Sequence, residues 1–96
     1  MEGVSSHASL LFALRTALNA MDTTSPNYDS VSEALRCAEA CHSLTMDSAN
    51  RARRSVLLRL SADHLRCANV TTDCAAENDA LETARSAMTA ALLDCL

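Results

Sequence analysis

Two short stretches of this sequence carry residue types that could ligate a metal ion. Residues 35–42 read LRCAEACH, in which Cys37 and Cys41 are four positions apart, and His64 and Cys67 follow three positions apart. Residues spaced by three or four share one face of a helix. If the two helices are antiparallel neighbours, four nitrogen and sulfur ligands could converge on a tetrahedral zinc ion, or on a cuprous ion, which favours thiolate.

The alternative interpretation is that these cysteines only pack, because a buried free cysteine behaves as a small hydrophobic residue. Residues 35–41 resemble the repeat of the CxxxC helices of cytosolic copper-storage bundles, but those bundles line their whole core with cysteine, and this chain has five. On a helix Cys37 and Cys41 are about 40° apart, which predicts Cys41 inward, Cys37 at the margin and His42 toward solvent. We therefore expect no cofactor, and keep the metal site of Cys37, Cys41, His64 and Cys67 as the alternative.

Catalytic motifs are missing from the sequence. There is no glycine-rich phosphate loop, no G-x-S-x-G turn and no paired-acid motif, and the three histidines have no evident nucleophile partner. We expect a protein that is not an enzyme.

The composition predicts helices. The 96 residues can form one domain, 1–96, and its core must be built from Ala, Leu, Val, Met and Cys, because there is one Phe, one Tyr and no Trp among 49% hydrophobic residues. One Gly and one Pro are too few for the turns of an all-β fold. The predicted fold class is all-α, an antiparallel bundle of three to four helices joined by short loops.

Apolar residues recurring every three or four positions locate the helices. The clearest break is 23–27, TTSPN, because the residue before Pro26 is disfavoured in the α region. The second helix begins either at Pro26 or at the capping box formed by Ser30 and Glu33, and Asp47 or Ser48 caps the third. The predicted ranges are roughly 6–22, 28–45, 48–70 and 73–95.

The third predicted helix has two apolar faces, more than two short neighbours should cover. One face contains Val56, Leu60 and Cys67; the other contains Leu58, Ala62, Leu65 and Ala68. Either the fourth helix covers the surplus, or a groove remains for an amphipathic helix of a partner. In the second case we expect Leu58, Ala62 and Leu65 to contact the partner, with Arg51 and Arg54 meeting its acidic residues; self-association through the same face would give a homo-oligomer.

Arginines gather at the start of this helix, where cations oppose the helix dipole: Arg51, Arg53 and Arg54. Such a run is either a solvated face, balanced by nearby carboxylates, or a docking site for an acidic partner segment. Both interpretations stay open at this point.

Residues 8–70 also contain motifs of a known kind of helical hairpin. They are Ala13-x-x-x-Ala17, Asp22, Asn27-Tyr28, Glu33-Ala34-Leu35 and Asp63-His64-Leu65-Arg66-Cys67-Ala68. In these motifs the chain resembles the microtubule-interacting-and-trafficking (MIT) domain, an antiparallel three-helix hairpin related to tetratricopeptide repeats. The chain departs from that pattern in a longer stretch between Tyr28 and Ala34, in His64 where tyrosine is usual, and in a fourth helix. The resemblance implies an adaptor that binds short helical tails of membrane-remodelling filament proteins along the third helix, without a cofactor.

Charge and hydropathy restrict the other partners. The net charge is −4 and no face combines aromatic with basic residues, which argues against nucleic acid. No apolar run is long enough to span a membrane. Residues 8–14, ASLLFAL, resemble the short hydrophobic region of a signal peptide, but Glu2 rather than a basic residue precedes them and Arg15 interrupts the pattern, so we expect no signal peptide. An odd number of cysteines favours free thiols, and the predicted location is the cytoplasm.

Overall fold

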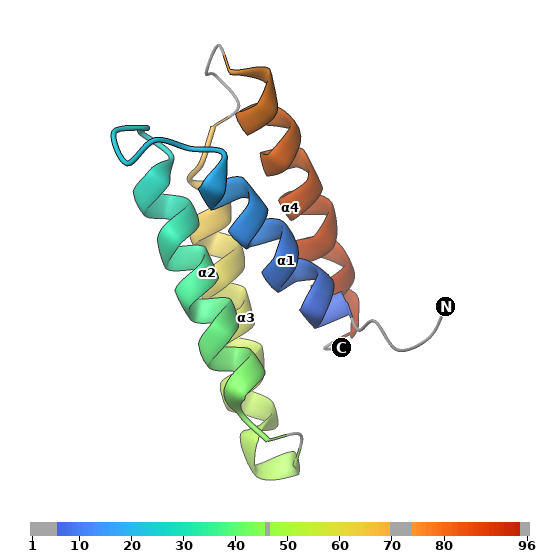
Figure 1. Cartoon of the computed structure of the whole chain (residues 1–96). Helices are drawn as coiled ribbons and strands as arrows, with labels where there is room; N and C mark the ends of the chain where they lie inside the picture. Colours follow the sequence, from blue (N-terminus) through green and yellow to red (C-terminus); the bar gives the residue numbers. More distant parts are fainter. Residues whose placement is uncertain (1–5, 46, 70–73, 95–96) are drawn as a thin grey trace.

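A computed structural model of the chain describes residues 6–45, 47–69 and 74–94. Over these residues it is an antiparallel, all-α bundle of four α-helices and one short 3₁₀ turn, as predicted for the fold class (Figure 1). The elements are α1 (Ser6–Asn19), α2 (Tyr28–Ser43), η1 (Ser48–Asn50), α3 (Arg51–Arg66) and α4 (Ala75–Asp94).

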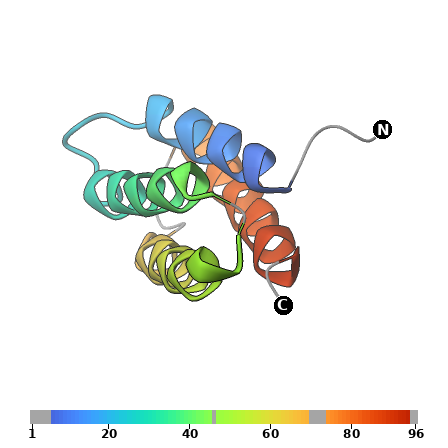
Figure 2. The ribbon, with the colours of Figure 1, turned by 90° about the horizontal axis from the view of Figure 1, so that it is seen from below.

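The helices form two antiparallel pairs, α2 with α3 and α1 with α4, and the pairs are joined where α1 packs against α2 (Figures 1 and 2). The start of α1 lies beside the end of α4, where the Ser6 hydroxyl donates to the Asp94 carboxylate. α3 and α4 contact each other much less than these pairs do, and the Arg85 side chain of α4 donates to the carbonyl of Ala68, just beyond the end of α3. α3 therefore has one principal neighbour, α2.

The core is built from leucine and alanine, which is what the composition predicts. The largest side chains that are fully buried are Leu10, Leu14, Leu58, Leu65, Leu81 and Val31. Alanines between them, such as Ala17, Ala34 and Ala38, are also fully buried, and their small size lets the helix backbones approach closely. Ala34 is in the core, whereas the larger Leu35 beside it is half-buried and packs against the core from its edge.

The helix ends follow local chemistry, with corrections of a few residues. α1 ends at Asn19, three residues before the predicted end, and the break around Pro26 is present. α2 begins at Tyr28, the first residue of the predicted range 28–45; the residue before it, Asn27, makes no side-chain capping bond.

The remaining ends differ from the predicted ones by up to four residues: α2 ends at Ser43 rather than at 45, and α3 ends at Arg66 rather than at 70. Asp47 caps the turn that leads into α3, because its Oδ1 accepts a hydrogen bond of 3.1 Å from the Asn50 N–H. α3 ends at Arg66 and α4 begins at Ala75, so the two are separate helices. Positions 70, 73 and 95, which bounded the predicted ranges, lie outside the described residues.

Candidate functional site

The three apolar residues expected to contact a partner lie inside the bundle. Leu58 is 0% exposed and Leu65 is 2% exposed, and Ala62 is half-buried and packs against the core. This face of α3 turns toward its own chain because it packs on α2: the Ser61 hydroxyl, on the same side, donates to the Ala34 carbonyl at 2.6 Å. Leu58 and Leu65 are core residues, so a partner could not reach them in the folded protein.

The two arginines expected to meet acidic residues have different environments. Arg54 is half-buried, and its Nη1 donates to the Thr45 carbonyl at 2.6 Å, which ties α3 to the start of the α2–α3 connection. The carbonyl of Arg54 accepts a hydrogen bond from the Cys41 thiol at 3.3 Å. Arg51 is exposed. Of the five residues predicted to bind a partner, Arg51 is exposed, Ala62 and Arg54 are half-buried, and Leu58 and Leu65 are buried.

The apolar surplus predicted for the third helix is present, but on the opposite face. Val56 is 56% exposed and Leu60 is 44% exposed, one helical turn apart and about 40° apart around the axis, and Cys67 at the end of the helix is exposed on the same side. We call Val56, Leu60 and Cys67 the α3 outer stripe. Exposed Arg53 and Arg59 lie roughly 60° to either side of Val56. A partly apolar surface between two cations therefore faces solvent. The exposed Asp63, which pairs with Arg66, lies on the same side beyond Leu60.

The alternative four-ligand metal site does not form, because the antiparallel register separates its two halves. Cys41 lies level with Arg54, near the start of α3. His64 is ten residues further along α3, about 15 Å away at 1.5 Å per residue, and Cys67 is further still. Among the described residues, no group of three or more His, Cys, Asp or Glu side chains is arranged to hold a metal ion.

The LRCAEACH segment packs as the helical wheel predicts. Cys41 is 1% exposed, Cys37 is half-buried and His42 is exposed. Burial raises the pKa of the Cys37 thiol, and the Glu33 carboxylate raises it further. The His42 ring stacks on His7 of α1 with 5.1 Å between centroids, which adds a contact between α1 and α2.

A buried polar cluster joins three segments that are distant in the sequence. The amide of Asn27, which is 4% exposed, pairs with the backbone of Asn69: Nδ2 donates to the carbonyl at 2.7 Å and Oδ1 accepts from the N–H at 2.9 Å. The same Nδ2 is 3.1 Å from Oε2 of Glu77, which is 5% exposed and also accepts from the Ser25 hydroxyl at 3.1 Å. These bonds hold the α1–α2 connection, the end of α3 and the start of α4 together.

This cluster was not predicted, although it explains why Asn27 does not cap α2. Asn27 and Glu77 are fifty positions apart, and in the sequence Asn27 is one more polar residue of a loop. The one available signal was Glu77 at a position that shares a helix face with Leu81 and Ala84, where a charged residue requires a partner.

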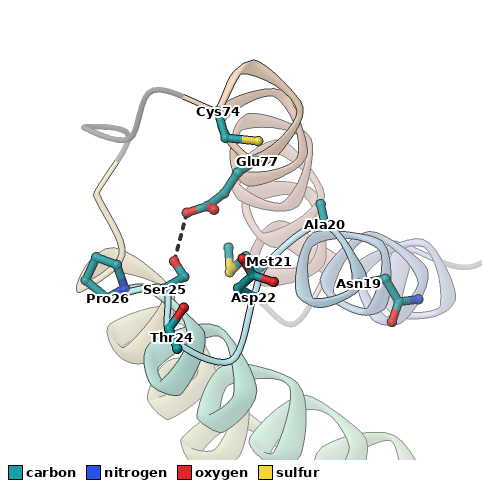
Figure 3. Close-up of a pocket in the computed structure, with 9 residues that line it drawn as sticks. All are labelled: Asn19, Ala20, Met21, Asp22, Thr24, Ser25, Pro26, Cys74 and Glu77. Atoms are coloured by element: carbon teal, nitrogen blue, oxygen red, sulfur yellow. Dashed lines mark hydrogen bonds between the residues drawn. The ribbon is translucent and has the colours of Figure 1, made fainter.

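An open hollow of about 470 Å³ lies beside the cluster, between the end of α1 and the start of α4 (Figure 3). Its wall includes the Glu77 carboxylate, the exposed Cys74 thiol, and Met21 and Asp22 of the α1–α2 connection. The hydrogen bond from Ser25 holds Glu77 against this connection, as the dashed line in Figure 3 shows. The geometry assigns these residues a structural role.

Comparison with known proteins adds no family to this picture: no family model, curated protein or solved structure matches the chain. The resemblance to the MIT domain therefore stays a prediction. Within the described residues, no helix has the length and hydropathy needed to cross a membrane.

Proposed function

We propose that this protein is a non-catalytic interaction module that binds an amphipathic helical segment on the α3 outer stripe. The observation that supports the proposal is the pair of partly exposed residues, Val56 and Leu60, on the side of α3 that faces away from its principal neighbour. Single exposed apolar residues are normal on folded proteins. Here two lie one turn apart, the spacing at which an amphipathic helix presents its own anchors.

The magnitude of the effect follows from the exposed fractions. The exposed parts of Val56 and Leu60, 56% and 44%, together amount to about one whole aliphatic side chain. Burying one such side chain contributes about 1.5–3 kcal/mol, which corresponds to a change in Kd of roughly tenfold to a hundredfold. The α3 outer stripe therefore supports a moderate affinity, and the polar residues around it decide which helices bind.

The test uses a synthetic helical peptide of roughly 18 residues, five turns, with leucines spaced three and four apart and a neutral polar face. We expect saturable binding in fluorescence anisotropy. The double variant Val56→Ser and Leu60→Ser should lose about tenfold to a hundredfold in affinity. Phe12→Ser with Leu93→Ser is the matched control, because these residues, 73% and 63% exposed, lie on α1 and α4.

Three measurements decide the outcome. Circular dichroism should show equal helicity in both double variants, because none of the four side chains is part of the buried core. Equal weakening in the two double variants would mean that binding is not located on α3. Absence of binding to any such peptide, together with a monomer in light scattering, would refute the proposal.

A further inference from the structure

The charges of this protein are distributed very unevenly. α3 contains five of the eight arginines and a single acidic residue, Asp63, so it carries +4 in a chain whose net charge is −4. The remainder of the chain therefore carries −8. A basic helix on an otherwise acidic protein gives a directional field, which attracts anionic groups to one face and repels them from the others.

The two arginines beside the α3 outer stripe are available for an external contact. Neither Arg53 nor Arg59 makes an ion pair or a side-chain hydrogen bond within the described residues, and both are exposed. By contrast, Arg66 pairs with Asp63, and Arg54 donates to the Thr45 carbonyl. The unpaired cations of α3 therefore flank its exposed apolar residues.

The start of α3 adds a second electrostatic argument. Its first turn contains no acidic residue, although carboxylates are the groups that the positive end of a helix dipole favours. Arg51 and Arg53 are placed there instead, where the dipole disfavours them. Carboxylates brought by a ligand to this end of α3 would be stabilised by both the arginines and the dipole.

These charges distinguish between the candidate occupants. In a symmetric dimer the same patch of both copies meets itself, so two helices of charge +4 would face each other, which is unfavourable. An anionic membrane is also a poor fit, because helices that lie in the membrane interface present a wide apolar face with large side chains. Here the opposite face of α3, with Leu58 and Leu65, is buried in the core.

We propose that the α3 outer stripe binds an acidic amphipathic helix of another protein. This inference rests on the proposed function and names its partner class. The helix places apolar anchors on Val56 and Leu60, and its Asp or Glu residues, one turn to either side, meet Arg53 and Arg59. Arg51 meets a further carboxylate beyond the start of α3.

The test compares two peptides that share one leucine stripe and differ only in the flanking positions, Glu in one and Lys in the other. With the whole protein in about 50 mM salt, the Glu peptide should bind about tenfold more tightly than the Lys peptide. The difference should largely disappear in about 500 mM salt, because screening then acts over a few Å. The double variant Arg53→Glu and Arg59→Glu should reverse the preference.

The control for net charge is Arg15→Glu with Arg36→Glu, which changes the total charge equally but lies on α1 and α2, with both side chains exposed. This control should keep the preference for the Glu peptide; reversal in it would show that only total charge matters, and would overturn the inference. If both peptides bind equally well and the double variant Val56→Ser with Leu60→Ser loses this binding, the proposed function would stand but the inference of an acidic partner would be refuted.

Two further outcomes would assign the stripe to another occupant and overturn the inference. One is dimerisation of the protein alone, lost in the same serine double variant. The other is binding to vesicles containing phosphatidylserine without binding to the Glu peptide. If no peptide of any charge binds and the protein is a monomer in light scattering, the proposed function fails as well.

Discussion

Replacing Asn27 by alanine tests whether the buried polar cluster holds the bundle together. The substitution removes two hydrogen bonds to the backbone of Asn69, of 2.7 and 2.9 Å, and one of 3.1 Å to the Glu77 carboxylate. A buried group left without its partner costs about 1–3 kcal/mol. Asn69 is exposed, so water can replace part of that loss. We expect a decrease of about 2–4 kcal/mol in the free energy of unfolding.

The assay is reversible urea and thermal denaturation followed by circular dichroism. For a domain of this size each kcal/mol lowers the Tm by about 4–8 °C, so Asn27→Ala should lower it by roughly 10–30 °C. Asn19→Ala is the matched control, because Asn19 is exposed at the end of α1 and makes no side-chain hydrogen bond within the described residues. A difference of less than about 0.5 kcal/mol between the two variants, the size typical of surface substitutions, would refute the assigned role of the cluster.

The isosteric change Asn27→Asp separates charge from hydrogen bonding at the same position. Near neutral pH the introduced carboxylate faces the Glu77 carboxylate in a buried site, so the variant should be at least as unstable as Asn27→Ala. Repulsion and burial both raise the pKa of the introduced carboxyl above its value in the unfolded chain. The loss should therefore shrink as pH falls, since a protonated carboxyl can again donate to Glu77. Indifference to pH would show that no carboxylate lies nearby.

The remaining predictions concern packing, capping and thiol reactivity. Leu58→Ala should lower the free energy of unfolding by about 2–5 kcal/mol, whereas Leu60→Ala, two positions along, should cost less than about 1 kcal/mol; comparable losses would contradict the assignment of the α3 faces. Asp47→Ala should lower the free energy of unfolding by about 0.5–2 kcal/mol, because the cap is lost. Asp47→Asn should keep most of that stability, because asparagine also caps helices. Because burial raises the pKa of Cys37, its alkylation by iodoacetamide at about pH 8 should be slower than that of exposed Cys67 and should accelerate at higher pH. Mass spectrometry of samples taken over time measures the two rates. Equal rates would contradict the burial of Cys37.

The helices themselves were predictable because their signals are local. The spacing of Leu11, Leu14, Leu18 and Met21 predicts a helix with one apolar face, which Leu10 and Ala17 widen. All of these residues are buried except Leu18, which is half-buried. Pro26 and its polar neighbours predict the break before α2, and Asp47 predicts a cap. Each of these signals depends on the geometry of a few consecutive residues, so it can be recognised without knowing what the helix packs against.

The candidate site was predicted only in part. The sequence indicates that the third helix has more apolar surface than its neighbours cover, and the exposed Val56 and Leu60 agree with that surplus. The sequence pattern led us to expect the partner contact at Leu58 and Leu65, but both residues are buried in the structure. A helical pattern gives the angles between side chains around one axis, but it does not say which of two apolar faces meets a neighbour.

By itself, then, the sequence determined an all-α bundle of three to four amphipathic helices, the approximate position of most helix ends, and the inward position of Cys41. The tertiary structure decided which face of α3 is covered, separated Cys41 from His64 through the antiparallel register, and brought Asn27 to Glu77 across fifty positions. The physical reason is that helix formation is governed by neighbours within about four residues. Register, coverage and buried polar pairs depend instead on the packing of whole helices against one another.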